Sequence, residues 1–387
     1  MKKLFGTFFK KHIICGIILG AEMYLFAWSA TIPVSPASDF KYELTKNGDG
    51  VRITGYTGGK YCHIPAEIEG LPVMELNSYA FSYSPDKDHI ETIIMPDTIK
   101  TVGEKPFDQL IGLKTVKLSS SLEAIPNGMF SGCYLLREIT IPRSVKSIGD
   151  WAFSSTGIKS IEIPSTVKKY GRYILSGCED LENVTLPPYM ENLPDGTFYR
   201  CTSLKTVQLP EGIKEISGEL FWCCYKLSSV KIPSSVTKIC ASAFNGCRSL
   251  TALEIPNSVI TIEYSAFDGT GLEELEIPDS VKELGCTFSH CSSLKKIKLP
   301  NCVTVIKSDM FYYSFSTYAE SLESITLPSS LKSIDTRAFA DNFKNLREVI
   351  IPDSIKSLGF GDNVFQGTSL TLKTQKQLRD LGYKGSF

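Results

Sequence analysis

The sequence predicts a repeat solenoid, in which short units stack into one elongated body with a continuous core. Three features support this prediction: an Ile-Pro or Leu-Pro pair recurs at a nearly constant interval, an alternating apolar strand precedes it, and a phenylalanine follows it. A unit of this length cannot bury its own apolar face. Stacking between neighbours buries that face and aligns the strands into a parallel sheet.

The proline spacing defines twelve repeats, called rungs below, between Pro96 and Pro352. Ser119 occupies the proline position midway between Pro96 and Pro142. The position numbers in this series differ by 22 or 23 as far as Pro300, and then by 28 and 24. The later prolines of the series are Pro142, Pro164, Pro187, Pro210, Pro233, Pro256, Pro278, Pro300, Pro328 and Pro352.

The rung from Leu204 to Cys224 shows how each segment contributes to the core. Val207 and Leu209 alternate with polar residues, as expected for a half-buried strand, and Pro210 ends that strand because it has no N–H. Ile213 and Ile216 form a second inward-facing segment. A phenylalanine eleven residues after proline closes most rungs, with Leu175 replacing it once and Phe288 one residue early: Phe107, Phe130, Phe153, Phe198, Phe221, Phe244, Phe267, Phe311 and Phe339.

The two ends differ from the repeat and predict caps. Residues Tyr42 to Tyr56 alternate around the turn-forming Asn47-Gly48-Asp49-Gly50, which indicates a β-hairpin that covers an open sheet edge. Near the C-terminus we expect Thr374 to cap a short helix that runs to Leu381 and ends at Gly382. The predicted organisation is a leader at 1–30, an N-terminal cap at 31–80, repeats at 81–372 and a helical cap at 373–387.

The motif Ile-Pro-x-x-Val-x-x-Ile-Gly-x-x-Ala-Phe-x-Gly-Cys-x-x-Leu, nearly complete between Ile141 and Cys247, resembles the BspA-like leucine-rich repeats of the Treponema pallidum type. The resemblance extends from about Asp39 to the end of the chain. It implies a right-handed, curved leucine-rich-repeat array with the parallel sheet on its concave face. It also implies a secreted or surface protein of a host-associated bacterium or parasitic protist, with adhesins among the members that have an assigned role and no catalytic residues to transfer.

The N-terminal segment indicates export. Lys2 and Lys3 precede an apolar run from Ile13 to Ala30, a pattern typical of secretory signals, with cleavage expected after Ser29. The run is nearly long enough to remain as a membrane anchor, although Glu22 interrupts it. Both outcomes stay open at this point, and we expect the protein to be secreted or held at the cell surface.

Six of the 12 cysteines lie three residues after the rung phenylalanine or leucine: Cys133, Cys178, Cys201, Cys224, Cys247 and Cys291. Thr156, Thr270 and Ser314 occupy the same position in other rungs, which favours a small buried group over a bonded one. In-register Cβ atoms on rungs roughly 4.8 Å apart exceed the ~3.8 Å that a disulfide prefers. We expect free core thiols, with disulfides or a metal as alternatives.

Composition limits the possible functions. The 41 basic and 42 acidic residues nearly cancel, so the chain has no general attraction for nucleic acid. His63, His89 and His290 fall in separate rungs and cannot share one metal. His290 precedes Cys291, a pairing that could suggest a Cys–His nucleophile. We interpret His290 instead as a residue that occupies the turn position held by glycine in the Gly-Cys pairs of other rungs. We predict no catalytic residue, metal or cofactor.

Two departures from the repeat are candidate binding residues. The outward positions of neighbouring rungs carry Glu254, Glu274 and Glu276, followed by Lys296 and Lys298. Charge pairing across a solvated sheet explains them best; partner binding and, more remotely, paired-carboxylate catalysis are alternatives. The long rung before Pro328 carries an uncharged aromatic insertion, and exposed aromatic residues often anchor interfaces: Tyr312, Tyr313, Phe315 and Tyr318.

These observations together predict an exported, non-enzymatic scaffold that binds a protein, such as a host matrix protein or a protein on a partner cell. The rival hypotheses are a structural or interbacterial surface module and a secreted enzyme. We expect membrane contact only through an uncleaved N-terminal segment.

Overall fold

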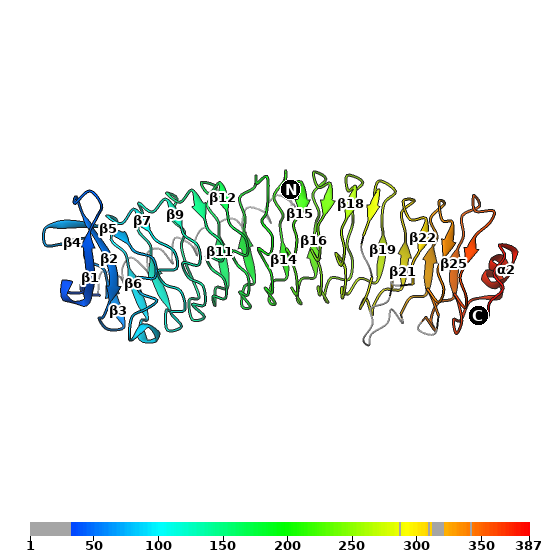
Figure 1. Cartoon of the computed structure of the whole chain (residues 1–387), viewed down its shortest axis with the longest axis horizontal. Coiled ribbons are helices and arrows are strands. Elements are labelled where there is room, and N and C mark those ends of the chain that lie inside the picture. Colours follow the sequence, from blue (N-terminus) through cyan, green and yellow to red (C-terminus); the bar gives the residue numbers. More distant parts are fainter. Residues whose placement is uncertain (1–31, 286–287, 309, 312–320, 341–342) are drawn as a thin grey trace, which may run out of the picture.

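The structure, a computed structural model, describes residues 32–285, 288–308, 310–311, 321–340 and 343–387. The chain forms an elongated, gently curved solenoid of about 13 turns, with the N-terminal hairpin at one end and a short helix at the other (Figure 1). The leucine-rich-repeat solenoid predicted from the sequence is confirmed.

The strand that precedes each proline stacks on its equivalent in the next rung and forms the first strand row. Its strands pair in parallel, as in Ser160 with Asn183 and Glu274 with Lys296. The row contains β3 (Tyr61–His63), β6 (Thr92–Ile94), β8 (Thr115–Lys117), β11 (Ser160–Glu162), β13 (Asn183–Thr185), β14 (Thr206–Val207), β16 (Ser229–Val230), β19 (Glu274–Glu276), β21 (Lys296–Lys298), β23 (Ser324–Thr326) and β25 (Glu348–Ile350).

A second strand row lies after the proline turn. Apart from β5, these strands have two residues each, and they pair in parallel, as in Glu215 with Lys238. The row contains β5 (Leu71–Leu76), β7 (Thr101–Val102), β9 (Ala124–Ile125), β10 (Ser147–Ile148), β12 (Lys169–Tyr170), β15 (Glu215–Ile216), β17 (Lys238–Ile239), β18 (Thr261–Ile262), β20 (Glu283–Leu284), β22 (Val305–Ile306), β24 (Ser333–Ile334) and β26 (Gly359–Phe360).

The core lies between the two rows and runs the length of the solenoid. The apolar residues that the sequence assigns inward in the rung from Leu204 are buried, including Val207, Ile216 and Phe221. Thr206 and Gln208 are exposed, as predicted. The alternation therefore gives the strand orientation correctly in this rung.

The rung phenylalanines form a buried column in which most neighbouring rings stack on each other. Phe198, Phe221 and Phe244 are fully buried, and successive ring centroids lie 5.6 and 5.5 Å apart. The predicted members of the column that the structure describes are all buried, as are Leu175 and Phe288. The sequence interpretation missed Phe81 and Phe365, which extend the stack toward the two caps.

Phe244→Ala is expected to destabilise the fold strongly, because it removes a ring packed between Phe221 and Phe267. Truncation of a buried phenylalanine typically costs about 3–5 kcal/mol. Urea unfolding followed by circular dichroism measures the change. Tyr264→Ala, at a ring that is 67% exposed, is the control, and equal midpoints for the two variants would contradict the assigned register.

In the rungs of Phe107 to Phe267, two backbone positions lie in the left-handed region, two residues before and two residues after the residue that closes the rung. Around Phe221 these are Glu219 with φ 54° and Cys223 with φ 56°. Gly246 occupies the second position in the next rung at φ 76°, where glycine has no steric penalty. His290, at φ 58°, occupies the glycine position as the sequence predicted.

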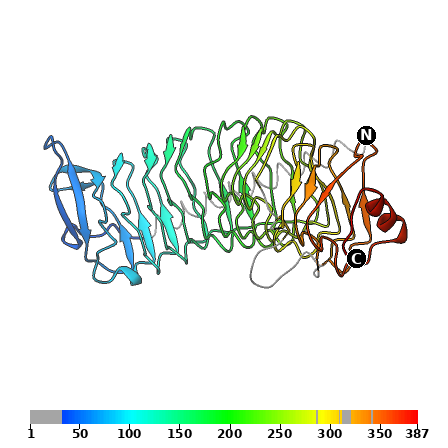
Figure 2. The same ribbon diagram turned by 45° about the vertical axis from the view of Figure 1, so that its right-hand side comes forward.

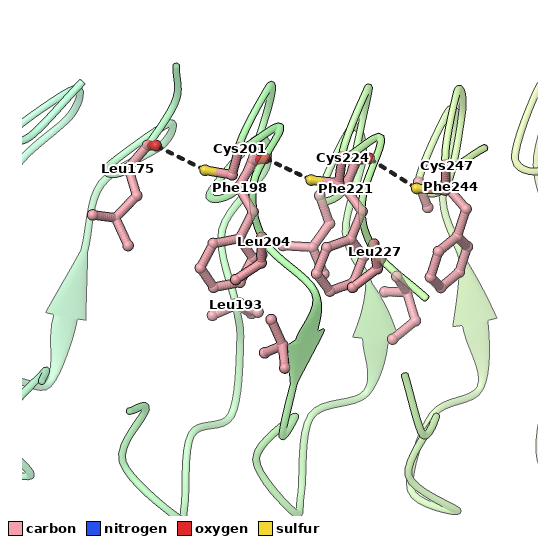
Figure 3. Close-up of a cluster of buried hydrophobic side chains, with 14 of the residues drawn as sticks. Leu175, Leu193, Phe198, Cys201, Leu204, Phe221, Cys224, Leu227, Phe244 and Cys247 are labelled. Carbon is pink, nitrogen blue, oxygen red and sulfur yellow. Dashed lines mark hydrogen bonds between the residues drawn. The ribbon is translucent and has the colours of Figure 1, made fainter. Parts of the chain in front are cut away.

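The cysteine column lies beside the phenylalanine stack. The thiols of Cys201, Cys224 and Cys247 each donate a hydrogen bond to the backbone carbonyl oxygen of the residue that closes the preceding rung (Figure 3). The Sγ–O distances are 3.0–3.2 Å, so the thiols link one rung to the next. The predicted column is therefore made of free, buried thiols.

Threonine satisfies the same position in a different way. Thr156 donates to the carbonyl oxygen of Phe153 in its own rung at 3.0 Å, and Thr270 donates to Phe267 at 2.8 Å. Cys62, Cys240 and Cys302, which lie off the column, are also free, whereas Cys286 lies outside the described residues.

The buried thiols should make stability fall at alkaline pH. Burial raises the pKa of Cys178 and of Cys291 from the ordinary 9.0 to about 11. A raised pKa in the folded chain means that the contribution to stability is fully present below about pH 9 and is lost as pH rises through about 11. We expect the urea midpoint to fall across this range.

Changing Cys178 and Cys291 to threonine, which the column already accepts, should make that fall shallower. Cys223→Ser, at a half-buried thiol outside the column, is the matched control and should follow the parent. The same pH dependence in all three proteins would contradict the assignment.

The predicted N-terminal hairpin is confirmed: β1 (Phe40–Leu44) pairs antiparallel with β2 (Val51–Tyr56). Strand β2 pairs in parallel with β5, so the hairpin extends the second strand row (Figure 2), and β4 (Glu67–Ile68) pairs antiparallel with β5. The outer strand β1 exposes Lys41 and Glu43, charges that discourage edge-to-edge association. Two 3₁₀ turns, η1 (Ala37–Asp39) and η2 (Lys87–His89), complete this half.

The C-terminal helix α2 (Leu372–Asp380) is confirmed, but its predicted start is wrong. Thr371 is the N-cap: its hydroxyl oxygen accepts from the backbone N–H of Thr374 at 3.3 Å. Thr374 lies inside the first turn and is buried. Gly382, at φ 102°, ends the helix as predicted, and Leu378 packs into the core.

Candidate functional site

The charged candidate residues lie on neighbouring strands of the first row. Glu274 on β19 is directly opposite Lys296 on β21, and Glu276 is opposite Lys298. The parallel register places both pairs on the same outward face. Their side chains are 43–69% exposed, so this part of the sheet faces solvent.

Each of these four residues has an ion-pair partner. The Nζ of Lys296 lies 2.7 Å from a carboxylate oxygen of Glu274, and that of Lys298 lies 2.5 Å from Glu276. The hydrogen bond to Glu274 raises the pKa of Lys296, and the hydrogen bond to Glu276 raises the pKa of Lys298. This arrangement agrees with charge pairing across the sheet.

A third pair, missed from the sequence, continues the set. Lys295 lies 2.7 Å from Glu273, one position before the predicted columns. These six residues, Glu273, Glu274, Glu276, Lys295, Lys296 and Lys298, are called the charge ladder below. Glu273 and Lys295 each lie five residues before the proline of their rung, so the repeat spacing alone could have predicted that they lie opposite each other.

Glu254 lies one rung before the charge ladder and is exposed. Within the described ranges it has no ion pair. The structure therefore brings four of the five charged candidates together as two pairs and leaves Glu254 beside them.

The aromatic insertion, with Tyr312, Tyr313, Phe315 and Tyr318, lies outside the described residues. Phe311 immediately before it belongs to the core, where its ring lies 5.6 Å from those of Phe288 and Phe339. In the sequence, the insertion follows the rung phenylalanine directly and precedes β23.

The described residues can also be compared with the requirements of metal binding and nucleophilic attack. Among the residues described, no three His, Cys, Asp or Glu side chains lie close enough to hold a metal ion. The column thiols are buried, and burial raises the pKa of Cys201 and Cys224 well above the ordinary value, which disfavours a thiolate nucleophile. In the same part of the chain, no helix has the length and apolar character needed to cross a membrane.

The fold and its outward-facing sheet define a leucine-rich-repeat scaffold. The family model of the BspA type leucine rich repeat region matches residues 67–182, 123–247, 169–286, 214–318 and 312–383. The chain belongs to this family. A comparison with curated proteins finds no match.

Solved structures show the same fold. A leucine-rich repeat protein from Bacteroides ovatus is 25% identical, with a TM-score of 0.63, and the match covers 92% of this chain and 99% of that one. The pneumococcal vaccine antigen PcpA is 21% identical, with a TM-score of 0.52 and coverage of 87% and 98%.

The charge ladder should stabilise the fold because the strand register places opposite charges directly across from each other. Lys296→Glu places a carboxylate opposite Glu274, and like charges at opposite positions are destabilising. We expect a lower urea midpoint at low ionic strength and a smaller difference at high salt, because the Debye length falls from about 10 Å at 0.1 M to about 3 Å at 1 M. Adding Glu274→Lys restores the pair and should recover the midpoint; no recovery would argue against the pairing.

Proposed function

We propose that the protein is an exported, non-enzymatic scaffold that binds proteins, acting as a bacterial cell-surface adhesin for host matrix proteins or other cells. The observation that carries this proposal is the first strand row, whose outward side chains are exposed on strands such as β11, β19 and β25 and are held in fixed register by parallel pairing. A rigid surface of this kind loses little conformational entropy when a partner binds.

Export is supported by the sequence, through its basic start and the apolar run from Ile13 to Ala30. The resemblance to BspA-like repeats, which occur on secreted and surface proteins, supports the same location.

Within this surface, the proposed contact site combines the charged candidates Glu254, Glu274, Glu276, Lys296 and Lys298 with the aromatic insertion. The ion pairs present an ordered pattern of opposite charges that favours one docking register. The insertion begins after Phe311, in the rung that starts with β21. In this proposal Tyr312, Tyr313, Phe315 and Tyr318 supply apolar anchors.

The test measures binding of the full chain to immobilised fibronectin, laminin and collagen and to whole bacterial cells, by biolayer interferometry and cell-adhesion assays. We expect saturable binding to at least one probe. The double variant Lys296→Glu/Lys298→Glu and a deletion of residues 312–316, which restores the usual rung length, should each weaken binding by about tenfold or more, equivalent to about 1.4 kcal/mol.

A charge-swapped variant, with Glu274 and Glu276 changed to Lys and Lys296 and Lys298 changed to Glu, is the matched control. It keeps every pair and should keep the parent's stability, yet it inverts the pattern that a partner would read and should lose binding. If no probe binds, the proposed function is wrong; if all three variants bind like the parent, the site lies elsewhere.

A further inference from the structure

A hollow of about 500 Å³ lies on the turns that follow the phenylalanine column, on a different part of the rung from the first strand row. Its lining includes Tyr134 on one side and Tyr199 on the other, two aromatic residues that come from rungs separated by two intervening turns. This volume falls within the ~300–1,000 Å³ of typical small-molecule sites. The hollow is distinct from the charge ladder.

The hollow lies where one rung is shorter than its neighbours. The rung of Phe153 reads Thr156-Gly157-Ile158 where the preceding rung reads Cys133-Tyr134-Leu135-Leu136, one residue more. Gly157 is buried, and a Cβ atom there would clash with the backbone carbonyl oxygen of Tyr134. Glycine therefore lets this rung approach the backbone of Tyr134 closely, and it adds no side chain to the hollow that both residues line.

The two aromatic walls differ in how they are held. Tyr134 is 53% exposed and has no ring contact within the described residues. Tyr199 is fixed between two rings: it stacks on Trp222 with centroids 4.5 Å apart and planes 6° from parallel, and meets Tyr173 edge-on at 5.9 Å. The hydroxyl of Tyr173 donates to Glu219 at 2.9 Å, which secures the group further.

The floor of the hollow is polar and uncharged. Ser155 and Ser176 lie on adjacent rungs, and the backbone N–H of Ser155 donates to the carbonyl oxygen of Ser176 at 2.7 Å. Neither hydroxyl has a hydrogen-bond partner within the part of the chain that the structure describes. Both are therefore free to bond to a ligand.

Three charged residues line the hollow, Glu179, Asp180 and Arg200, and Arg137, which lies outside the lining, pairs with Asp180, so that the charges cancel. Arg137 pairs with Asp180 across the intervening rung of Gly157, and Arg200 lies 3.8 Å from Glu179. All four side chains are about half exposed or more. The guanidinium and carboxylate groups can donate and accept hydrogen bonds to a ligand, and because they are paired they favour neither an anionic nor a cationic ligand.

We propose that this hollow binds a neutral saccharide. A pyranose ring has apolar C–H faces, which pack against aromatic walls, and a polar edge of hydroxyl groups that donate and accept hydrogen bonds. The serine floor and the arginine–carboxylate rim match that edge, and the balanced charge disfavours a simple anion or cation. Because Tyr199 is already fixed by its neighbours, binding orders few additional side chains.

The test is saturation-transfer difference NMR and calorimetry on the full chain. The probes are glucose, galactose, mannose, N-acetylglucosamine and their β-linked disaccharides. We expect at least one to bind with a Kd of about 1 mM or tighter. Tyr134→Ala should weaken that binding by about tenfold or more, because it removes the free wall without touching the core.

Tyr225→Ala is the matched control. Tyr225 holds the same repeat position, four residues after its rung phenylalanine, and is 39% exposed but does not line the hollow. It should bind the saccharide like the parent.

A second variant, Ser176→Phe, should abolish binding by filling the hollow. Ser155 has a left-handed backbone at φ 55°, and Ser176 does not, so Ser176 is the position that accepts a larger side chain. An unchanged urea midpoint would show that the fold is intact.

Binding of none of these sugars would overturn the proposal, and so would binding that persists in both Tyr134→Ala and Ser176→Phe. Either result leaves protein binding at the first strand row unaffected. Loss of sugar binding in Tyr134→Ala with retention in Tyr225→Ala is the result that supports a saccharide site.

Discussion

The structure depends on one constraint: each rung must pack its closing side chain, a phenylalanine in most rungs and Leu175 in one, against those of the neighbouring rungs. A single rung has no interior of its own, so its ring is buried only by neighbours on both sides. Around Phe221 the ring distances of 5.6 and 5.5 Å leave little room for variation. Backbone bonds such as that from the N–H of Phe221 to the carbonyl oxygen of Ala243 enforce the same register.

The caps satisfy this constraint at the ends with different secondary structure. At the N-terminus the hairpin supplies Tyr56, whose ring lies 5.3 Å from Phe81, the first ring of the column. At the C-terminus Tyr383, which follows helix α2, lies 5.3 Å from Phe365. The hairpin and the end of the helix therefore both cap the core, because each places an aromatic ring over the terminal phenylalanine of the column.

The sequence predicts the parts that repeat. Proline, phenylalanine and cysteine recur at fixed intervals, so the core, the strand orientation and the pairing of Glu274 with Lys296 could all be derived from spacing. The left-handed positions could not, because Trp151, Glu219 and Ser242 share that conformation without sharing chemistry. The helix start was misjudged for a related reason: Thr371 and Thr374 are equally good caps in sequence, and only packing of Thr374 into the interior distinguishes them.

Stability and recognition are separated in this architecture because they use different positions of the same rung. Inward positions are held to a few residue types by the stack, whereas outward positions can change without disturbing it. Tyr134 and Tyr225 illustrate this: they share one repeat position, yet only Tyr134 lines the hollow described above. The difference arises in the following rung, where Gly157 follows Tyr134 and Arg248 follows Tyr225 and packs over its ring at 5.0 Å. A solenoid therefore creates a site through a local departure from its repeat, and the departures are the places where function is best sought.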